Sequence, residues 1–313
     1  MSDTGNYEQK LAAEAELWGR ESAQQAQTTP PDWQYHQHLR HNVIMHGADI
    51  ESLLSVIRPG MQTLELGCAS GWLTLAMAER GAQATGLDIS EQALQVARDY
   101  AEQVRKRWRG DVQYRQADLN ALDLPAEYYD VIVVKAALHH LVNLDHVIQT
   151  VHRALKPGGL FWVSDTDGDE ALPTVLVAGA LTFLLPTETS YADKIRALLR
   201  FGFRAPSRVK ASIQAEGLSP FEGAGREHDW LKLISQQFSI EKRVDAPAFT
   251  GYVTAQVKLP DWAAIPLLKG LRAVDRILVR VGLLHNTGVT LYARKAQSAG
   301  QLPTDNPPRR VVS

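Results

Sequence analysis

The stretch LELGCASGWLT, residues 64–74, places small residues where the chain must pass close to a ligand. Gly67, Ala69 and Gly71 follow an apolar run at two-residue intervals, which is typical of a tight loop after a buried strand. Asp88 lies twenty-one residues after Gly67, a spacing at which an acidic side chain accepts hydrogen bonds from ribose hydroxyls. The loop and the acid together predict a nucleoside-binding site.

Trp72 stands where a dinucleotide-binding loop has its third glycine. That glycine packs the helix against the strand and leaves room for the pyrophosphate. A glycine loop followed by an acid would otherwise allow a nicotinamide cofactor, so an NAD-dependent oxidoreductase is an alternative. A plain tight turn is a further alternative, which the independent match of Asp88 disfavours. The tryptophan favours a ligand without pyrophosphate.

Composition limits the remaining classes of function. The chain has 313 residues, 45% hydrophobic and 22% charged, which suits one large domain or a core with an added cap. Thirty-three basic and thirty-five acidic residues give a net charge of −2, so the chain has no overall attraction for nucleic acid. A single cysteine excludes an internal disulfide and a multi-cysteine metal site.

The N-terminal sequence MSDTGNYEQK is polar and has no apolar segment typical of a signal peptide. The longest apolar run, residues 172–185, has fourteen residues including one proline and is too short to span a bilayer. We therefore expect a soluble, cytoplasmic protein.

Short strands alternate with helices from residue 61 onward. We expect strands over 62–67, 84–90, 112–119, 129–138, 160–165, 238–245 and 287–295, and helices over 72–81, 91–107 and 145–159. This alternation predicts an α/β fold, a doubly wound, mostly parallel, seven-stranded Rossmann-like sheet. Long connections after the fifth and sixth strands exceed what a turn needs and predict cap segments over the site.

The expected division of the chain follows from these elements. Helices over about 7–25 and 32–57 lie before the first strand. We expect five parts: an N-terminal helical lid over 1–58, a Rossmann-like core over 59–165, a cap or substrate insertion over 166–236, the final sheet strands with an inserted amphipathic helix over 237–295, and a flexible tail over 296–313.

Five motifs occur in order along the core: ELGCASG, GLDIS, QADLNAL, YDVIVVKAALHHL and ALKPGGLFWVSD. In these motifs the chain resembles the class I S-adenosylmethionine-dependent methyltransferases, especially the small-molecule group that includes ubiquinone/menaquinone C-methyltransferases. The resemblance covers about residues 60–165 and implies S-adenosyl-L-methionine as the cofactor of the core. The family usually has a glycine at the position of Ala69. Alanine is the smallest replacement, so we expect binding to survive with a slightly altered loop.

The resemblance also implies a role for each matching residue. Loop residues would surround the amino-acid end of the cofactor, and later motifs would hold the ribose and the adenine. The implied cofactor-binding residues are Glu65, Gly67, Ala69 and Gly71 at the amino-acid end, Asp88 on the ribose, Ile89 on the adenine face, Asp118 with Ala117 and Leu119 at the adenine amino group, and Lys135 at the end of the fourth strand. For Asp118, the cap of a helix after the third strand is an alternative.

His139 and His140 follow the fourth strand, where the resemblance places the transferred methyl group. The Asn/Asp-Pro-Pro-aromatic tetrapeptide of nucleic-acid amine methyltransferases does not occur here, so a base in DNA or RNA is not expected as acceptor. Imidazole, with a pKa near ~6.5, can remove the proton of a hydroxyl acceptor. One of the two histidines could instead be structural. The acids after the fifth strand, Asp165, Asp167 and Glu170, are alternative bases. We predict Glu170 as a catalytic residue together with the two histidines.

A second histidine group, His36, His38, His41 and His46, occurs before the core. Three of these histidines could approach one helix face, which would suit a metal ion. No carboxylate or cysteine accompanies them at a matching spacing, so we expect no metal site. With Trp33 and Tyr35, we interpret this segment as part of the lid over cofactor and acceptor.

An amphipathic helix is expected over 265–284, with arginines and a lysine beside a broad apolar face. Its apolar face comprises Leu267, Leu268, Leu271, Val274, Ile277, Leu278 and Val281. Such a helix packs on a domain, joins subunits of an oligomer or lies on an anionic membrane. With the apolar run over 172–185, this helix adds a lipid-linked acceptor to the small-molecule acceptors that the resemblance implies. We expect a sugar, a phenol or quinone or an isoprenoid-like chain, methylated on oxygen or carbon. A cofactor-binding protein without catalysis is the remaining alternative.

Overall fold

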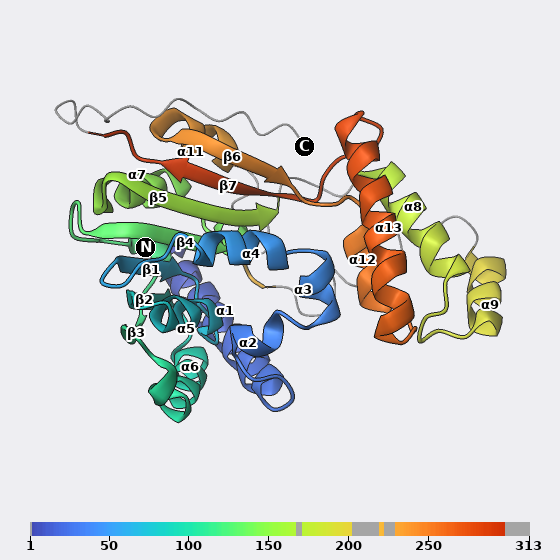
Figure 1. Cartoon of the computed structure of the whole chain (residues 1–313), viewed down its shortest axis with the longest axis horizontal. Coiled ribbons are helices and arrows are strands. Elements are labelled where there is room, and N and C mark those ends of the chain that lie inside the picture. Colours follow the sequence, from blue (N-terminus) through green and yellow to red (C-terminus); the bar gives the residue numbers. More distant parts are fainter. Residues whose placement is uncertain (1, 167–170, 202–218, 222–228, 298–313) are drawn as a thin grey trace.

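The predicted strands form one seven-stranded sheet in the order β3-β2-β1-β4-β5-β7-β6 (Figure 1). The structure, a computed structural model, describes residues 2–166, 171–201, 219–221 and 229–297. The first five strands run parallel, and β7 lies antiparallel between β5 and β6. The strands are β1 (Gln62–Leu66), β2 (Gln83–Asp88), β3 (Asp111–Gln116), β4 (Tyr129–Lys135), β5 (Leu155–Thr166), β6 (Ser239–Asp245) and β7 (Gly288–Arg294). The predicted fold class is confirmed.

Helices cover both faces of the sheet because its central strands are apolar on both faces. Along β4, Val131 and Val133 point to one hydrophobic core, and Ile132 and Val134 point to the other. The helices around the sheet are α4 (Gly47–Leu54), α5 (Trp72–Glu79) and α6 (Glu91–Gln103) on one side, and α7 (Leu144–Ala154) and α11 (Trp230–Gln237) on the other.

The helix predicted to continue through residue 159 ends earlier. Helix α7 stops at Ala154, and β5 begins at Leu155, which pairs with Tyr129 of β4. Pro157 disfavours the helical conformation for the residue before it, so an extended chain starts here. The prediction was wrong because it used Gly158 and Gly159 as the helix stop and gave too little weight to the proline.

The N-terminal segment forms four helices. The prediction of a polar helix over 7–25 corresponds to α1 (Ser2–Ala26), which packs against α6. The two helices predicted over 32–57 are three short ones, α2 (Trp33–His36), α3 (Arg40–Ile44) and α4. Asp32 caps α2 by accepting from the backbone N–H of Gln34, and it also accepts hydrogen bonds from Arg107 and Tyr100.

A second group of helices stands beside the sheet, and we call it the cap lobe (Figure 1). Its helices are α8 (Leu172–Leu184), α9 (Tyr191–Phe201), α12 (Thr250–Gln256) and α13 (Asp261–Arg280). The lobe has a hydrophobic core of its own, which includes Phe249, Val253 and Leu268 together with Ile44 of α3. Arg40 of α3 fastens the lobe by donating to the carbonyl oxygens of residues 257 and 259 at 2.6 Å each.

Helix α13 confirms the predicted amphipathic helix but buries a different face. Leu268 is buried as expected, whereas Val274, Ile277 and Val281 are at least half exposed. The side turned inward includes Asp275, which is fully buried. The apolar arc of this helix is wider than its contact with α3 and α12, so the periodicity alone could not tell which part would be covered.

Asp275 is buried because it completes the hydrogen bonds of the chain that enters α12. Its carboxylate accepts from the backbone N–H groups of residues 248–250 at 2.7–2.9 Å and from the hydroxyl of Thr250 at 2.7 Å. These N–H groups lie at a helix start, where no helical carbonyl reaches them. Asp275 thus connects α13 to α12 inside the lobe.

Replacing Asp275 by alanine should destabilise the protein by about 3 kcal/mol or more, since several buried N–H groups lose their acceptor. Asp275→Asn keeps one carbonyl oxygen as acceptor, so its free energy of unfolding should fall by less. Urea denaturation followed by circular dichroism measures both differences. An unchanged midpoint for Asp275→Ala would contradict the role given to this carboxylate.

Candidate functional site

The carboxyl ends of five parallel strands meet along one edge of the sheet. Leu66 at the end of β1 pairs with Leu87 on one side and with Val134 on the other. Lys135, the last residue of β4, pairs with Ser164 of β5. The loops that contain the motif residues therefore lie side by side, at the edge where ligands bind in open α/β sheets.

The loop after β1 is shaped by three residues with positive φ. Gly67 has φ 74°, Ala69 φ 44° and Gly71 φ 75°. For Ala69 this left-handed conformation costs about 1 kcal/mol or more, which gives a physical reason for the glycine usual in the resembling family. The backbone N–H of Ala69 donates to Asp88 Oδ2 at 2.8 Å. The carboxylate of Asp88 thereby holds the altered loop in place.

Gly71 admits no side chain. A Cβ at this position would lie 2.4 Å from the ring of Tyr114, whose hydroxyl donates to the Gly71 carbonyl at 2.9 Å. This contact between β3 and the loop fixes the start of α5.

Glu65 and Asp88 are two buried acids on neighbouring strands. Thr74 of α5 donates a hydrogen bond to Glu65, and the backbone N–H of Ser90 donates to Asp88 at 2.9 Å. Burial raises the pKa of Glu65 to about 8, and burial also raises the pKa of Asp88. A cationic ligand beside these carboxyl groups would stabilise their ionised forms.

Asp118 follows β3 and takes part in two kinds of contact. Its Oδ1 accepts from the backbone N–H of Asn120 at 2.9 Å, so it caps a short 3-10 helix, the alternative left open from the sequence. Its Oδ2 accepts from the hydroxyl of Tyr7 on α1 at 2.7 Å. The other predicted adenine neighbours, Ile89 and Ala117, are half-buried, and Leu119 is buried in the core.

Lys135 lies at the end of β4 between acidic and aromatic groups. Its Nζ is 6.0 Å from the ring centroid of Trp72, and it interacts electrostatically with Glu65 and Asp165. Burial lowers the pKa of Lys135. The next residue, Ala136, has φ 53°, a strained conformation for a non-glycine residue at the turn into the histidine pair.

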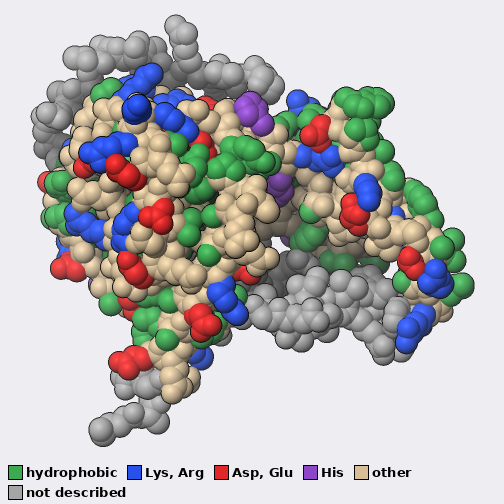
Figure 2. All heavy atoms as spheres, turned by 90° about the horizontal axis from the view of Figure 1, so that it is seen from below, with side chains coloured by type: hydrophobic (Ala, Val, Ile, Leu, Met, Phe, Trp, Pro, Cys, Tyr) green, Lys and Arg blue, Asp and Glu red, His purple; other side chains and the backbone are tan. Residues whose placement is uncertain are grey.

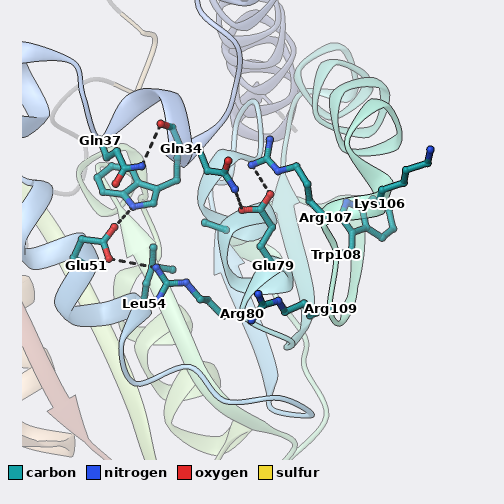
Figure 3. A pocket seen from close by; sticks show the side chains of 12 residues that line it. Gln34, Gln37, Glu51, Leu54, Glu79, Arg80, Lys106, Arg107, Trp108 and Arg109 are labelled. Atoms are coloured by element: carbon teal, nitrogen blue, oxygen red, sulfur yellow. Dashed lines mark hydrogen bonds and ion pairs between the residues drawn. The ribbon is translucent and has the colours of Figure 1, made fainter.

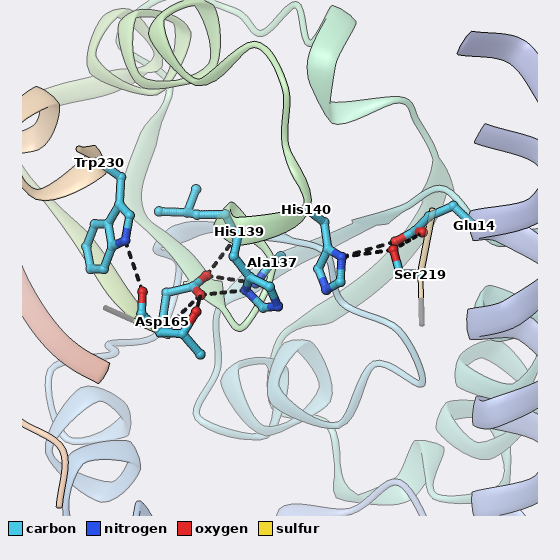
Figure 4. A network of polar contacts seen from close by, with 9 residues as sticks. Glu14, Ala137, His139, His140, Asp165, Ser219 and Trp230 are labelled. Atoms are coloured by element: carbon cyan, nitrogen blue, oxygen red, sulfur yellow. Dashed lines mark hydrogen bonds and ion pairs between the residues drawn. The ribbon is translucent and has the colours of Figure 1, made fainter. Parts of the chain in front are cut away.

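His139 forms a buried pair with Asp165 of β5 (Figure 4). Its Nδ1 lies 2.6 Å from Asp165 Oδ1. Asp165 Oδ2 accepts from the backbone N–H groups of Ala137 and Leu138 at 3.0 and 2.7 Å. One carboxylate therefore fixes both the turn after β4 and the imidazole ring.

His140 points the other way, toward α1 (Figure 4). Its Nδ1 is 3.1 Å from Ser219 Oγ and 3.4 Å from Glu14 Oε1, and its ring lies edge-on to Trp18. Ser219 also donates to Glu14. Helix α1 was predicted only as part of the N-terminal lid, and none of its residues was predicted at the site. Its less exposed residues Tyr7, Glu14 and Trp18 recur at seven- and four-residue intervals, a signal that could have identified the inner face of this helix.

Similarity to known proteins identifies the family of the chain. The model of a methyltransferase domain matches residues 64–163. A ubiquinone biosynthesis O-methyltransferase from Coxiella burnetii is 33% identical over 176 residues, which cover 55% of this chain and 70% of that protein. The chain belongs to the class I S-adenosylmethionine-dependent methyltransferases. It is accordingly an enzyme, and its cofactor is S-adenosyl-L-methionine, as predicted.

Two further proteins are similar to the chain. A ubiquinone biosynthesis O-methyltransferase from Pseudomonas entomophila is 36% identical over 164 residues, 51% of this chain and 65% of that protein. A solved S-adenosylmethionine-dependent methyltransferase from Mesorhizobium loti is 22% identical, with a TM-score of 0.46 over 79% of this chain and 96% of that one.

The remaining predicted residues are the acids after β5 and the second histidine group. Asp167 and Glu170 lie outside the described residues, so the structure says nothing of them. His36 is buried and His46 is half-buried, and burial lowers the pKa of both, that of His46 to about 3, whereas His38 and His41 are exposed. Within the described parts of the chain, no group of three or more histidine, cysteine, aspartate or glutamate residues could hold a metal ion.

A pocket of about 440 Å³ lies apart from the motif residues (Figure 3). Its wall contains Arg107, which pairs with Glu79 at 2.5 Å, and Arg80, which pairs with Glu51 at 3.3 Å. None of the residues matched to the cofactor lines it. Its charges stabilise the contact of α4 and α5 with the segment after α6.

Among the helices of the described residues, none is both long and apolar enough to cross a membrane.

We expect cofactor binding beside Glu65 to depend on pH. With a pKa of about 8, its carboxyl is mostly protonated at pH 7, whereas a cationic cofactor favours the carboxylate. Binding should therefore release a proton, and affinity should rise with pH, by up to about tenfold per unit below pH 8.

Isothermal titration with S-adenosyl-L-methionine, in two buffers of different ionisation enthalpy, measures the proton released. In Glu65→Gln the part of the pH dependence that comes from this carboxyl should vanish, and affinity should fall. Equal proton release in wild type and Glu65→Gln would show that another group titrates.

Proposed function

We propose that the enzyme transfers a methyl group to the hydroxyl oxygen of a small-molecule acceptor, with His139 as general base. The observation that carries this proposal is the buried pair of His139 with Asp165 beside Lys135, at the carboxyl ends of β4 and β5. The names of the curated relatives support oxygen as the acceptor atom and a phenol- or quinone-like acceptor, because they are O-methyltransferases of ubiquinone biosynthesis.

The residues at the edge of the sheet fit the cofactor. We assign Glu65 and the loop of Gly67, Ala69 and Gly71 to its amino-acid end and Asp88 to its ribose. Glu65 is a buried acid whose pKa stays raised although Lys135 interacts with it, and the ammonium group would further stabilise its carboxylate. We assign Asp118, with Ile89, Ala117 and Leu119, to adenine. Bound there, S-adenosyl-L-methionine supplies a methyl group activated by its sulfonium.

Asp165 prepares His139 for proton transfer. Its carboxylate can only accept a hydrogen bond at 2.6 Å, so the Nδ1 of the neutral imidazole carries the proton. The lone pair then lies on Nε2, which takes the proton of the acceptor hydroxyl as its oxygen attacks the methyl carbon. The carboxylate stabilises the imidazolium that forms.

The acceptor is placed between the end of β4 and the N-terminal helices. Trp72 stacks on Trp33 at 5.4 Å and meets His36 edge-on at 5.5 Å, so α2 joins the wall beside Lys135. We propose that residues 1–58 act as a lid and that the cap lobe closes the acceptor side. The exposed apolar side chains of the cap helices favour an acceptor linked to a lipid.

Removing the base should lower turnover while cofactor affinity stays nearly unchanged, since His139 is not among the residues assigned to the nucleoside. We expect His139→Ala to lose ~10²–10⁴-fold in rate, less at high pH, where the hydroxyl ionises without help. Asp165→Asn should lower the rate by a comparable factor, because the amide can donate to Nδ1 and so favour the tautomer with its proton on Nε2. The double variant should be little slower than either single one.

The measurement is methyl transfer from radiolabelled cofactor to phenolic and lipid extracts of cells that express the protein, with mass spectrometry of the product. His140→Ala is the matched control and should keep most of the turnover. A larger loss in His140→Ala would transfer the role of base to that residue. A product methylated on carbon would overturn the assignment of an oxygen acceptor.

A further inference from the structure

Exposed apolar side chains are concentrated on the cap lobe. Among the described residues sixteen large apolar side chains are exposed, and twelve of them lie on α8, α9, α13 or the turn after α13. The twelve are Leu172, Leu176, Leu184, Tyr191, Ile195, Leu198, Leu199, Trp262, Val274, Ile277, Val281 and Leu283. Figure 2 shows such side chains along the outer edge of the lobe. A surface of this kind marks an interaction site.

The outer face of α13 is apolar, although packing within the lobe uses the opposite side of this helix. Trp262 is 81% exposed, Ile277 60% and Val281 62%. Ile277 and Val281 are one turn apart and therefore lie on the same side of the helix. Ala264 and Leu268, on the opposite side, are fully buried and supply the contact with the core of the lobe.

Cations border this face. Lys269, Arg276 and Arg280 are exposed at spacings of seven and four residues, and no described carboxylate forms an ion pair with any of them. The exposed acids of the lobe and of its adjoining turns are neutralised by partners. The pairs are Asp193 with Arg196 at 2.8 Å, Asp261 with Arg40 at 2.7 Å and Glu188 with Lys258 at 2.8 Å. The surface thus has an excess of positive charge.

We propose that the cap lobe docks on an anionic phospholipid surface through the outer faces of α8, α9 and α13. Apolar side chains enter the boundary of the acyl chains, and Lys269, Arg276 and Arg280 contact lipid phosphates. A second copy of the chain fits less well, because a two-fold interface centred on this face would bring the same cations of both copies together. Docking goes beyond the proposed reaction and does not depend on it.

The test is co-sedimentation with vesicles of phosphatidylcholine containing phosphatidylglycerol, against vesicles of phosphatidylcholine alone, without cofactor or acceptor. The full-length protein should bind the anionic vesicles much more strongly. Ile277→Gln with Val281→Gln should reduce binding at least tenfold, and Lys269→Gln with Arg280→Gln should lose roughly fivefold per cation removed. All four positions are exposed, so circular dichroism should show folded variants.

Val142→Gln and Lys106→Gln are matched controls, since both positions are exposed and lie outside the lobe. They should bind vesicles as the wild type does. Absence of binding to anionic vesicles, or equal binding by all variants, would overturn the proposal. So would a dimer in analytical ultracentrifugation that Ile277→Gln dissociates, because the face would then join two copies of the chain.

Discussion

The hydrogen bonds accepted by the carboxylate of Asp165 are the interactions on which the site depends. One oxygen accepts two backbone N–H groups of the turn after β4, and the other meets His139 at 2.6 Å. The parallel pairing of β4 with β5 brings Asp165 to that turn. A turn with a strained residue, Ala136, is held there by a buried acid, so the position of the imidazole follows from the register of the sheet.

The same edge contains buried acids of different electrostatic character. Glu65 has a pKa of about 8 because it is enclosed with only a threonine as hydrogen-bond donor, whereas Asp88 binds the backbone of the loop and of the next helix. The enclosed acid is suited to a cationic ligand. The other acid keeps a loop in shape even though alanine replaces the usual glycine.

Helix α1 brings the N-terminal segment into contact with the motif residues. Tyr7 donates to Asp118 after β3 and Glu14 lies beside His140 after β4, so a helix distant in sequence contacts the residues that follow two strands of the sheet. The cap lobe is different in kind, because it has its own hydrophobic core and leaves much of its outer surface apolar. Among the described residues, the exposed large apolar side chains are concentrated on the lobe.

Local patterns in the sequence determined the sheet and the loop after β1. Apolar runs such as that of β4 define buried strands, and the spacing of Gly67, Gly71 and Asp88 follows from one βαβ unit, so neither needs knowledge of distant contacts. The tertiary structure alone decided the pairing of His139 with Asp165, the contact of Glu14 with Ser219 and the exposed arc of α13. Residues 14 and 219 are 205 positions apart, and no periodicity encodes such a contact. A helical pattern gives the width of an apolar face, but packing against neighbouring helices determines which part of that face is buried.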